Sequence, residues 1–168
     1  IDNLSTGHKE SVNEKAEFFE VDLTDLKKLK VIFNTVKPEI VMHFAGLSHV
    51  SESNIVPEKY YRNNVFGGLC LLRAMLESGC KKLVFSSSAA VYGEPKKIPI
   101  SEEHTLNPIS VYGETKALFE WMLGYFDRIH GVKFLCFRYF NAGGASGNGL
   151  FGERHKPESH LIPNILKA

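Results

Sequence analysis

Strand-like apolar runs alternate with helix-like stretches along the whole chain. Helical apolar spacing marks a segment that Thr24 would cap and Pro38 would close, and three further segments at 57–78, 111–129 and 162–167. Short strand-like runs lie between them, at 18–21, 39–45, 82–86 and 133–139. Since strands with so few polar residues are typical of parallel sheets covered on both faces, this alternation predicts a doubly wound α/β fold.

The composition argues against several classes of protein. The 168 residues suit one domain, and a net charge of +1 with scattered Lys and Arg argues against a nucleic-acid surface. No apolar run is long enough to span a bilayer. The odd number of cysteines, Cys70, Cys80 and Cys136, and their lack of a framework pattern argue against a disulfide scaffold. We expect Cys70 and Cys136, which lie in apolar runs, to be core residues, and reduced thiols suit a cytoplasmic location. The seven His are dispersed, which predicts no metal site.

The predicted strand ends are expected to share one edge of the sheet. In doubly wound sheets, ligands bind beyond the carboxyl ends of the strands. Asp22, residues 45–46, residues 86–88 and residues 139–141 each lie at or just after the end of a predicted strand. We therefore expect them to line one site, with the helix at 111–129 descending over it.

That helix carries a tyrosine and a lysine one turn apart. Tyr112 and Lys116 are spaced i and i+4, so their side chains share one helix face. An ammonium beside a phenol favours the phenolate, which predicts a lowered pKa for Tyr112 and a usable proton acceptor and donor. The alternative is a solvated lysine and a half-buried tyrosine on an ordinary helix.

Several motifs in one order carry a resemblance to a known family. They are HFAGL at 43–47, YYRNNV at 60–65, FSSSAAVYG at 85–93, SVYGETK at 110–116, RYFNAGGA at 138–145 and GERHKPESHLIP at 152–163. Together they resemble the extended short-chain dehydrogenase/reductases of the NAD-dependent epimerase/dehydratase family, and most closely the UDP-glucose 4-epimerase family. The resemblance covers nearly the whole chain and implies a Rossmann-like domain.

The resemblance implies a catalytic set of Ser88, Tyr112 and Lys116. Tyr112 would take the proton of the sugar 4-hydroxyl while hydride leaves C4 for tightly bound NAD, and the 4-keto sugar would turn before hydride returns. Ser88 would bind the reacting oxygen, and Lys116 would hold the nicotinamide ribose and keep the tyrosine acidic. The activity implied is the interconversion of UDP-glucose and UDP-galactose. The alternative for residues 86–88 is a run of serines that are hydrogen-bonded at a strand end and have no functional role. For Ser87 this alternative is about as plausible as a role in the site.

The resemblance also implies cofactor contacts. An acid at Asp2 would grip the adenosine ribose and disfavour NADP, or it would only cap its own turn. Asn64 would lie near the cofactor or merely join helix to sheet, and Tyr139 and Phe140 would wall the site or belong to the core. The full set of NAD contacts comprises Asp2, Asn3, Leu4, Thr6, Gly7, Asp22, Leu23, Phe44, Ala45, Gly46, Leu47, Asn64, Ser86, Tyr112, Lys116, Tyr139 and Phe140.

Substrate contacts are implied at Asn141, His160 and Leu161, besides Ser88 and Tyr112. Asn141 matches the residue that binds the sugar diphosphate, and His160 and Leu161 match the contacts to uridine or phosphate. Many relatives carry Asn in place of His160. His155 is expected on the loop surface. The residues leave open whether the sugar pair is glucose and galactose, an N-acetylated pair or a pentose pair.

The chain departs from the family at its start. The first strand and its G-x-x-G-x-x-G loop, which cradles the pyrophosphate, do not precede Ile1. We therefore expect residues 1–168 to be a partial Rossmann domain from a longer enzyme, inactive and weak in NAD binding alone. The resemblance implies a homodimer that forms through the helices at 57–78 and 111–129. On the second helix, Trp121, Met122 and Phe126 could lie in the core or in this interface, and we expect them in the core.

Three rival functions remain. A nucleotide-sugar dehydratase needs an acidic pair where this chain has Ser88 and Ala89, so loss of water is disfavoured. A decarboxylase would need a partner for a glucuronate carboxylate. A non-catalytic nucleotide-sugar-binding subunit would have no need for an intact Ser88, Tyr112 and Lys116.

Overall fold

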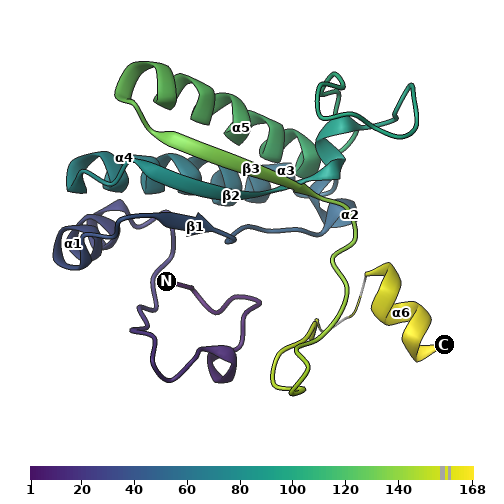
Figure 1. The fold of residues 1–168 in the computed structure, drawn as a ribbon, viewed down its shortest axis with the longest axis horizontal. Helices are drawn as coiled ribbons and strands as arrows, with labels where there is room; N and C mark the ends of the chain where they lie inside the picture. Colours follow the sequence, from purple (N-terminus) through teal and green to yellow (C-terminus); the bar gives the residue numbers. More distant parts are fainter. Residues whose placement is uncertain (156–157, 159) are drawn as a thin grey trace.

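A three-stranded parallel sheet organises the chain. The computed structural model describes residues 1–155, 158 and 160–168. In these residues β1 (Val41–His43), β2 (Lys82–Ser88) and β3 (Lys133–Tyr139) lie side by side in the order β1-β2-β3 (Figure 1). Val41 pairs with Leu83, and Lys82 pairs with Lys133. The parallel sheet and its crossover helices confirm the predicted α/β class.

Three long helices cover one face of the sheet. On β2, Leu83 and Phe85 are 2% exposed and belong to one core with Leu29 of α1 (Leu26–Val36), Met75 of α4 (Gly67–Ser78) and Phe119 of α5 (Val111–His130). The shorter helical elements are Lys9–Ser11, α2 (Val50–Ser53), α3 (Pro57–Tyr60), a π-helical turn at Tyr61–Phe66, a 3₁₀ turn at Ala89–Tyr92 and α6 (Leu161–Lys167). Among the described residues, a smaller apolar cluster of Val91, Tyr92 and Ala117 accompanies this main core.

The opposite face of the sheet is apolar and exposed. Side chains alternate along a strand, so Met42, Leu135 and Phe137 point away from the helices. They are 60%, 52% and 44% exposed. We expected helices on both faces, but within the described residues they cover only one.

Two predicted strands are shorter in the structure. The run at 18–21 forms only an isolated parallel bridge between Asp2 and Glu20, because the chain turns at Leu4, which has a φ of 55°. The run at 39–45 is a strand only from Val41 to His43, since the chain turns away near Gly46, at a φ of 147°. The prediction of a seven-residue buried strand there is wrong.

Helix ends follow the sequence signals with one correction. The predicted N-cap Thr24 is replaced by Asp25, whose carboxylate accepts the backbone NH of Lys28 at 3.1 Å. The Thr24 hydroxyl instead donates to Asp22 at 2.6 Å. Gly79 ends the helix begun at Pro57, as predicted, although that helix contains the π-helical turn.

The cysteines and aromatic residues also test the sequence reasoning. Cys70 and Cys80 are buried and Cys136 is partly buried, and all three are free thiols, as predicted. Met122 and Phe126 pack against the core, whereas Trp121 is 50% exposed, so the core prediction holds for the first two only. In the described residues, no helix has both the length and the apolar character that crossing a membrane requires.

Candidate active site

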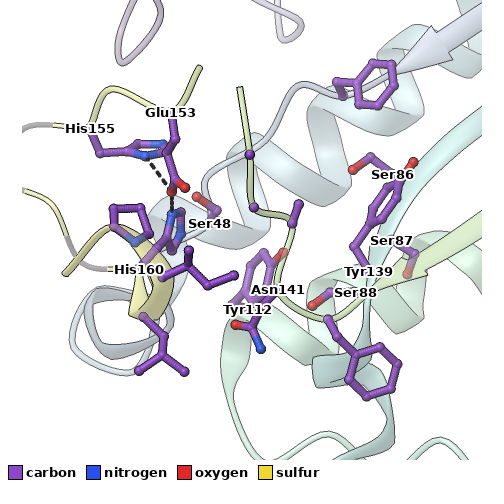
Figure 2. Close-up of a pocket in the computed structure, with 18 residues that line it drawn as sticks. Ser48, Ser86, Ser87, Ser88, Tyr112, Tyr139, Asn141, Glu153, His155 and His160 are labelled. Atoms are coloured by element: carbon purple, nitrogen blue, oxygen red, sulfur yellow. Dashed lines mark hydrogen bonds and ion pairs between the residues drawn. The ribbon is translucent and has the colours of Figure 1, made fainter. Parts of the chain in front are cut away.

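A cavity of about 640 Å³ lies beyond the carboxyl ends of β2 and β3. Figure 2 shows the serines of β2 and Tyr139 on one side of it and Glu153, His155 and His160 on the other. This volume is in the range of small-molecule sites. Of the predicted site residues, the cavity is lined by Phe44, Ser86, Ser88, Tyr112, Tyr139, Phe140, Asn141, His160 and Leu161.

The start of α5 is held against the end of β2. The Ser110 side chain caps α5 by accepting the NH of Gly113 at 3.1 Å, and the NH of Tyr112 donates to the Ser53 hydroxyl at 3.0 Å. A Cβ at Gly113 would lie 2.5 Å from the carbonyl oxygen of Ala90. Glycine therefore allows the helix to approach the turn after β2 closely, and this brings Tyr112 to Ser88.

The Tyr112 phenol does not have the lowered pKa that the sequence predicted. Burial raises its pKa, and the interaction with the Ser88 hydroxyl only partly offsets this. The Nζ atom of Lys116 is 5.7 Å from the centre of the Tyr112 ring and donates instead to the carbonyl oxygen of Ser86 at 2.9 Å. The prediction of a lowered pKa for Tyr112 is wrong, because desolvation of the phenol outweighs its hydrogen bonding.

Lys116 is a buried cation beside a neutral imidazole. The residue is 6% exposed, and burial lowers the pKa of its ammonium to about 8. Its Nζ lies 4.9 Å from the centre of the Phe85 ring. The His43 imidazole, 5% exposed, has its pKa lowered to about 3 by burial and by the charge of Lys116. The sequence reasoning missed His43, which only the packing of β1 under Lys116 reveals.

Asn64 links helix to sheet. The Leu47 NH donates to its side-chain oxygen at 2.9 Å, and its Nδ2 donates to the Leu47 carbonyl at 3.1 Å and to the Thr115 hydroxyl at 3.0 Å. Asn64 is 7% exposed and lines neither the large cavity nor the smaller one described next. Its amide therefore secures the loop after β1 to α5.

A second cavity, about 140 Å³, gathers many of the residues predicted to bind the cofactor. Phe44 lines both cavities. Leu4 and Asp22 do not line it: the Leu4 NH donates to Asp2 at 2.7 Å, and Asp22 accepts from Asn3 at 2.7 Å. Asp2 therefore also caps its own turn. The predicted residues that line this cavity are Asp2, Asn3, Thr6, Gly7, Leu23, Phe44, Ala45, Gly46 and Leu47.

Ser87 belongs to a structural network that the sequence did not reveal. Its hydroxyl donates to the Glu120 carboxylate at 2.5 Å, and the Arg138 guanidinium donates to the same carboxylate through Nη2 at 2.7 Å. Glu120 is 8% exposed. Ser87 is therefore a hydrogen-bonded serine at the end of the strand, which was the alternative to a role in the site.

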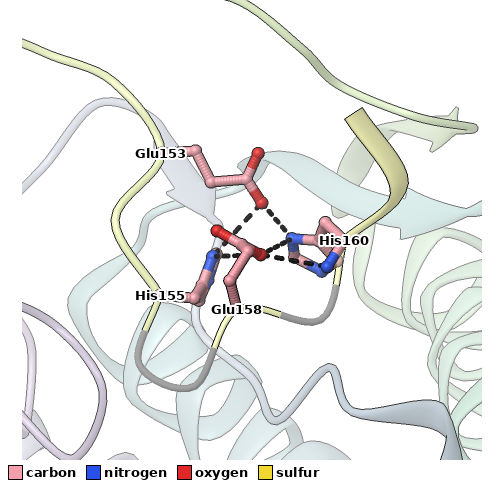
Figure 3. Close-up of side chains that lie close together, drawn as sticks. All are labelled: Glu153, His155, Glu158 and His160. Atoms are coloured by element: carbon pink, nitrogen blue, oxygen red, sulfur yellow. Dashed lines mark hydrogen bonds and ion pairs between the residues drawn. The ribbon is translucent and has the colours of Figure 1, made fainter. Parts of the chain in front are cut away.

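Two glutamates and two histidines meet at the far side of the large cavity. Glu153, His155, Glu158 and His160 each offer one donor atom, and these atoms lie within 4.8 Å of one another (Figure 3). His155, predicted on the loop surface, lies outside the helices and strands with its side chain 35% exposed, and it also lines the cavity. The spacing E-x-H-x-x-E-x-H at 153–160 is the sequence signal for this cluster, which the dispersal of the seven histidines did not reveal.

Comparison with known proteins decides the family. The model of the NAD dependent epimerase/dehydratase family matches residues 1–168. The chain belongs to this family. It is 51% identical over 168 residues to a UDP-glucose 4-epimerase of Lactobacillus helveticus, covering 100% of this chain and 51% of that protein. For the UDP-glucose 4-epimerase of Halalkalibacterium halodurans, the identity is 47%, covering 100% of this chain and 50% of the relative.

Solved structures of this epimerase/dehydratase family share the fold. A crystal structure of a UDP-glucose 4-epimerase superimposes with a TM-score of 0.96 at 46% identity, covering 98% of this chain and 50% of that one. The Brucella ovis UDP-glucose 4-epimerase, crystallised with NAD, gives 0.94 at 44% identity over 97% of this chain and 50% of that one. The chain thus spans about half the length of the relatives that it matches.

Proposed function

We propose that the protein is an NAD-dependent epimerase that interconverts UDP-glucose and UDP-galactose, a reaction of galactose metabolism. The observation that carries the proposal is that Tyr112 and Ser88 interact in the lining of a cavity large enough for a sugar nucleotide. Buried Lys116 lies behind this lining and donates to the carbonyl oxygen of Ser86, which also lines the cavity. Relatives at 40–51% identity are named UDP-glucose 4-epimerases, which supports this reaction over the others in the family.

The residues around the smaller cavity suit a dinucleotide. A Cβ on Gly46 would stand 3.3 Å from Asn64 and 3.6 Å from Nζ of Lys116, so glycine leaves the backbone open beside the ammonium. Asp2 offers a carboxylate of the kind that accepts ribose hydroxyls. In this proposal the set predicted from the sequence holds NAD, and Lys116 binds the nicotinamide ribose. When bound, NAD supplies the hydride acceptor and donor.

The proton chemistry falls to Tyr112 and Ser88. The Ser88 hydroxyl interacts with the phenol and lowers its pKa, so it is placed to pass the proton of the sugar 4-hydroxyl to the phenol oxygen. Burial raises the pKa of Tyr112, and the hydrogen bond with Ser88 opposes this. Returning the proton along the same path completes either direction of epimerisation.

The opposite wall of the cavity is proposed to hold the rest of the substrate. Asn141 follows β3 and has an amide that can donate to a diphosphate oxygen. His160 immediately precedes α6 and Leu161 is its first residue, and both are proposed to contact the uridine or its phosphate. Tyr139 and Phe140 are 42% and 66% exposed, which suits side chains that wall a ligand site better than core residues.

We also propose a homodimer formed through the helices at 57–78 and 111–129. Large apolar side chains project from both: Phe66 is 48% exposed, Trp121 50%, Tyr125 58% and Ile129 69%. Exposed aromatic residues of this size are enriched at subunit interfaces. The mass of the full-length protein in solution tests this part of the proposal.

Tyr112→Phe in the full-length protein tests the reaction. We expect turnover of UDP-galactose to fall by about 10²–10⁴-fold with UDP binding retained, because the ring stays and only the proton-carrying oxygen is lost. Tyr125→Phe removes a phenolic hydroxyl from the same helix but away from the lining of either cavity, so it is the matched control and should keep full turnover. Parallel assays with UDP-N-acetylgalactosamine and UDP-xylose identify the preferred sugar pair.

Two outcomes would contradict the proposal. Unchanged turnover in Tyr112→Phe would remove the phenol from the chemistry. Formation of a dehydrated or decarboxylated product, or the absence of any turnover by the wild type despite UDP-sugar binding, would favour one of the rival functions.

A further inference from the structure

Residues 153, 155, 158 and 160 place two imidazoles and two carboxylates around one point. Nδ1 of His155 lies 3.2 Å from Oε1 of Glu153 and 4.0 Å from Oε1 of Glu158. Nδ1 of His160 contacts Oε1 of Glu153 and lies 3.8 Å from Oε1 of Glu158. Figure 3 shows the four side chains turned toward one another from the two ends of the segment. A tetrahedral ion with bonds of about 2.1 Å separates its ligand atoms by about 3.4 Å, which is close to the spacing of most of these pairs.

Nδ1 of His160 is hydrogen-bonded to Glu153, but the corresponding nitrogen of His155 is not hydrogen-bonded. Nδ1 of His155 is buried and makes no hydrogen bond, although Glu153 is within 3.2 Å of it. A buried imidazole nitrogen in a polar cluster normally donates or accepts. The nitrogen of His155 faces carboxylate oxygens without bonding to them. Ligands of a shared cation have this arrangement, because all of their lone pairs point at one centre.

The surroundings favour an ion over repulsion between the carboxylates. The Glu158 side chain is only 6% exposed and that of Glu153 is 18% exposed, so two negative charges are held close together with limited access to water. Buried carboxylates need a compensating charge. A divalent cation bound between the two carboxylates would balance their charge completely.

We propose that Glu153, His155, Glu158 and His160 form a binding site for a divalent transition-metal ion, with Zn²⁺ as the best fit. Two nitrogen and two oxygen donors suit Zn²⁺, whereas Mg²⁺ and Ca²⁺ prefer oxygen ligands alone. Four protein ligands fill a tetrahedral shell and leave no open position, which is typical of a structural ion.

The structural consequence concerns the wall of the large cavity. His160 is the residue immediately before α6, and Glu153, His155 and His160 all line the cavity. An ion bound by all four residues would cross-link the loop to the start of α6 and hold that wall in place opposite Tyr112. Its role would be to order the cavity, with the proton chemistry left to the other side.

Zn²⁺ titration of the metal-stripped full-length protein tests this site directly. Calorimetry should show one Zn²⁺ per chain, and Co²⁺ in its place should give the strong visible absorption of a four-coordinate site. We expect His155→Ala and His160→Ala each to weaken Zn²⁺ binding at least tenfold, while His130→Ala, an exposed histidine at the end of α5, should leave it unchanged.

The binding measurement is independent of enzymatic activity, so it can fail while the proposed epimerase reaction stands. Absence of Zn²⁺ binding to the wild type would overturn the site. Equal binding by the wild type and a His155→Ala, His160→Ala double variant would also overturn it, because the ion would then be adventitious. Circular dichroism of each variant checks folding, and Glu153→Gln provides a milder change expected to weaken binding as well.

Discussion

The buried ion pair between α5 and β3 should contribute far more to stability than its exposed counterpart on the same two elements. Arg138 of β3 donates to the Glu120 carboxylate of α5 through Nε, at 3.1 and 3.2 Å, and through Nη2, at 2.7 Å. The Ser87 hydroxyl adds a third donor. Glu120 also holds the pKa of Arg138 above its usual range. This network fastens the end of β2, just before Ser88, to both neighbouring elements.

The perturbation is Glu120→Gln, which keeps the shape of the side chain and removes its charge. Removing one partner of a buried pair costs about 3–5 kcal/mol. Arg138 keeps two other acceptors, the Tyr92 hydroxyl at 2.8 Å and the Glu102 carbonyl at 2.9 Å, and its side chain is 23% exposed. These reduce the loss, so we expect the free energy of unfolding to fall by about 2–4 kcal/mol.

The matched control is Asp127→Asn. Asp127 of α5 pairs with Lys133 of β3 at 2.6 Å, but the two side chains are 33% and 75% exposed. An exposed pair contributes about 0–1 kcal/mol. Urea unfolding of both variants, followed by circular dichroism, gives the comparison. Equal losses in Glu120→Gln and Asp127→Asn, or a loss below about 1 kcal/mol in Glu120→Gln, would refute the reasoning from burial.

Two further predictions concern packing and pH. Gly68→Ala should destabilise the protein strongly, because the added Cβ would lie 2.4 Å from the Phe119 ring. At Gly124 an added Cβ would have no atom within 4 Å, so Gly124→Ala should stabilise α5 by about 0.5–1 kcal/mol. Thermal unfolding of the two variants distinguishes these effects. His43 has a folded pKa of about 3 against an ordinary 6.5, so the folded state binds fewer protons between these pH values. Stability should therefore fall by about 1.4 kcal/mol for each unit of acidification in that window, and His43→Phe should flatten this slope; an unchanged slope in urea unfolding would contradict it.

Local signals in the sequence were sufficient for the class and most element ends. Gly79 and Gly131 end their helices with φ of 80° and 71°, and Pro57 opens its helix, because these effects depend on a few neighbouring residues. The rule that ligands bind beyond the carboxyl ends of parallel strands also indicated that residues 86–88 and 139–141 would line one site. Asp25 replaced Thr24 as a cap because both lie beside the helix start and the local signal did not distinguish them.

Tertiary structure alone decided the properties that depend on burial. The spacing of Tyr112 and Lys116 indicated a shared helix face, but packing turned the ammonium toward the Ser86 carbonyl and desolvated the phenol, so the pKa of Tyr112 rises where the sequence predicted a fall. Packing likewise produced the Glu120 network and the neutral state of His43. Desolvation and contact between distant residues have no local signature.

The sequence by itself determined the alternation of strands and helices and the family motifs, since both are written in neighbouring residues. Only the fold decided which side chains lose contact with water and which meet from distant positions, as Ser87 and Glu120 do. The physical reason is that the free energy of a charge or a proton depends on its surroundings in three dimensions.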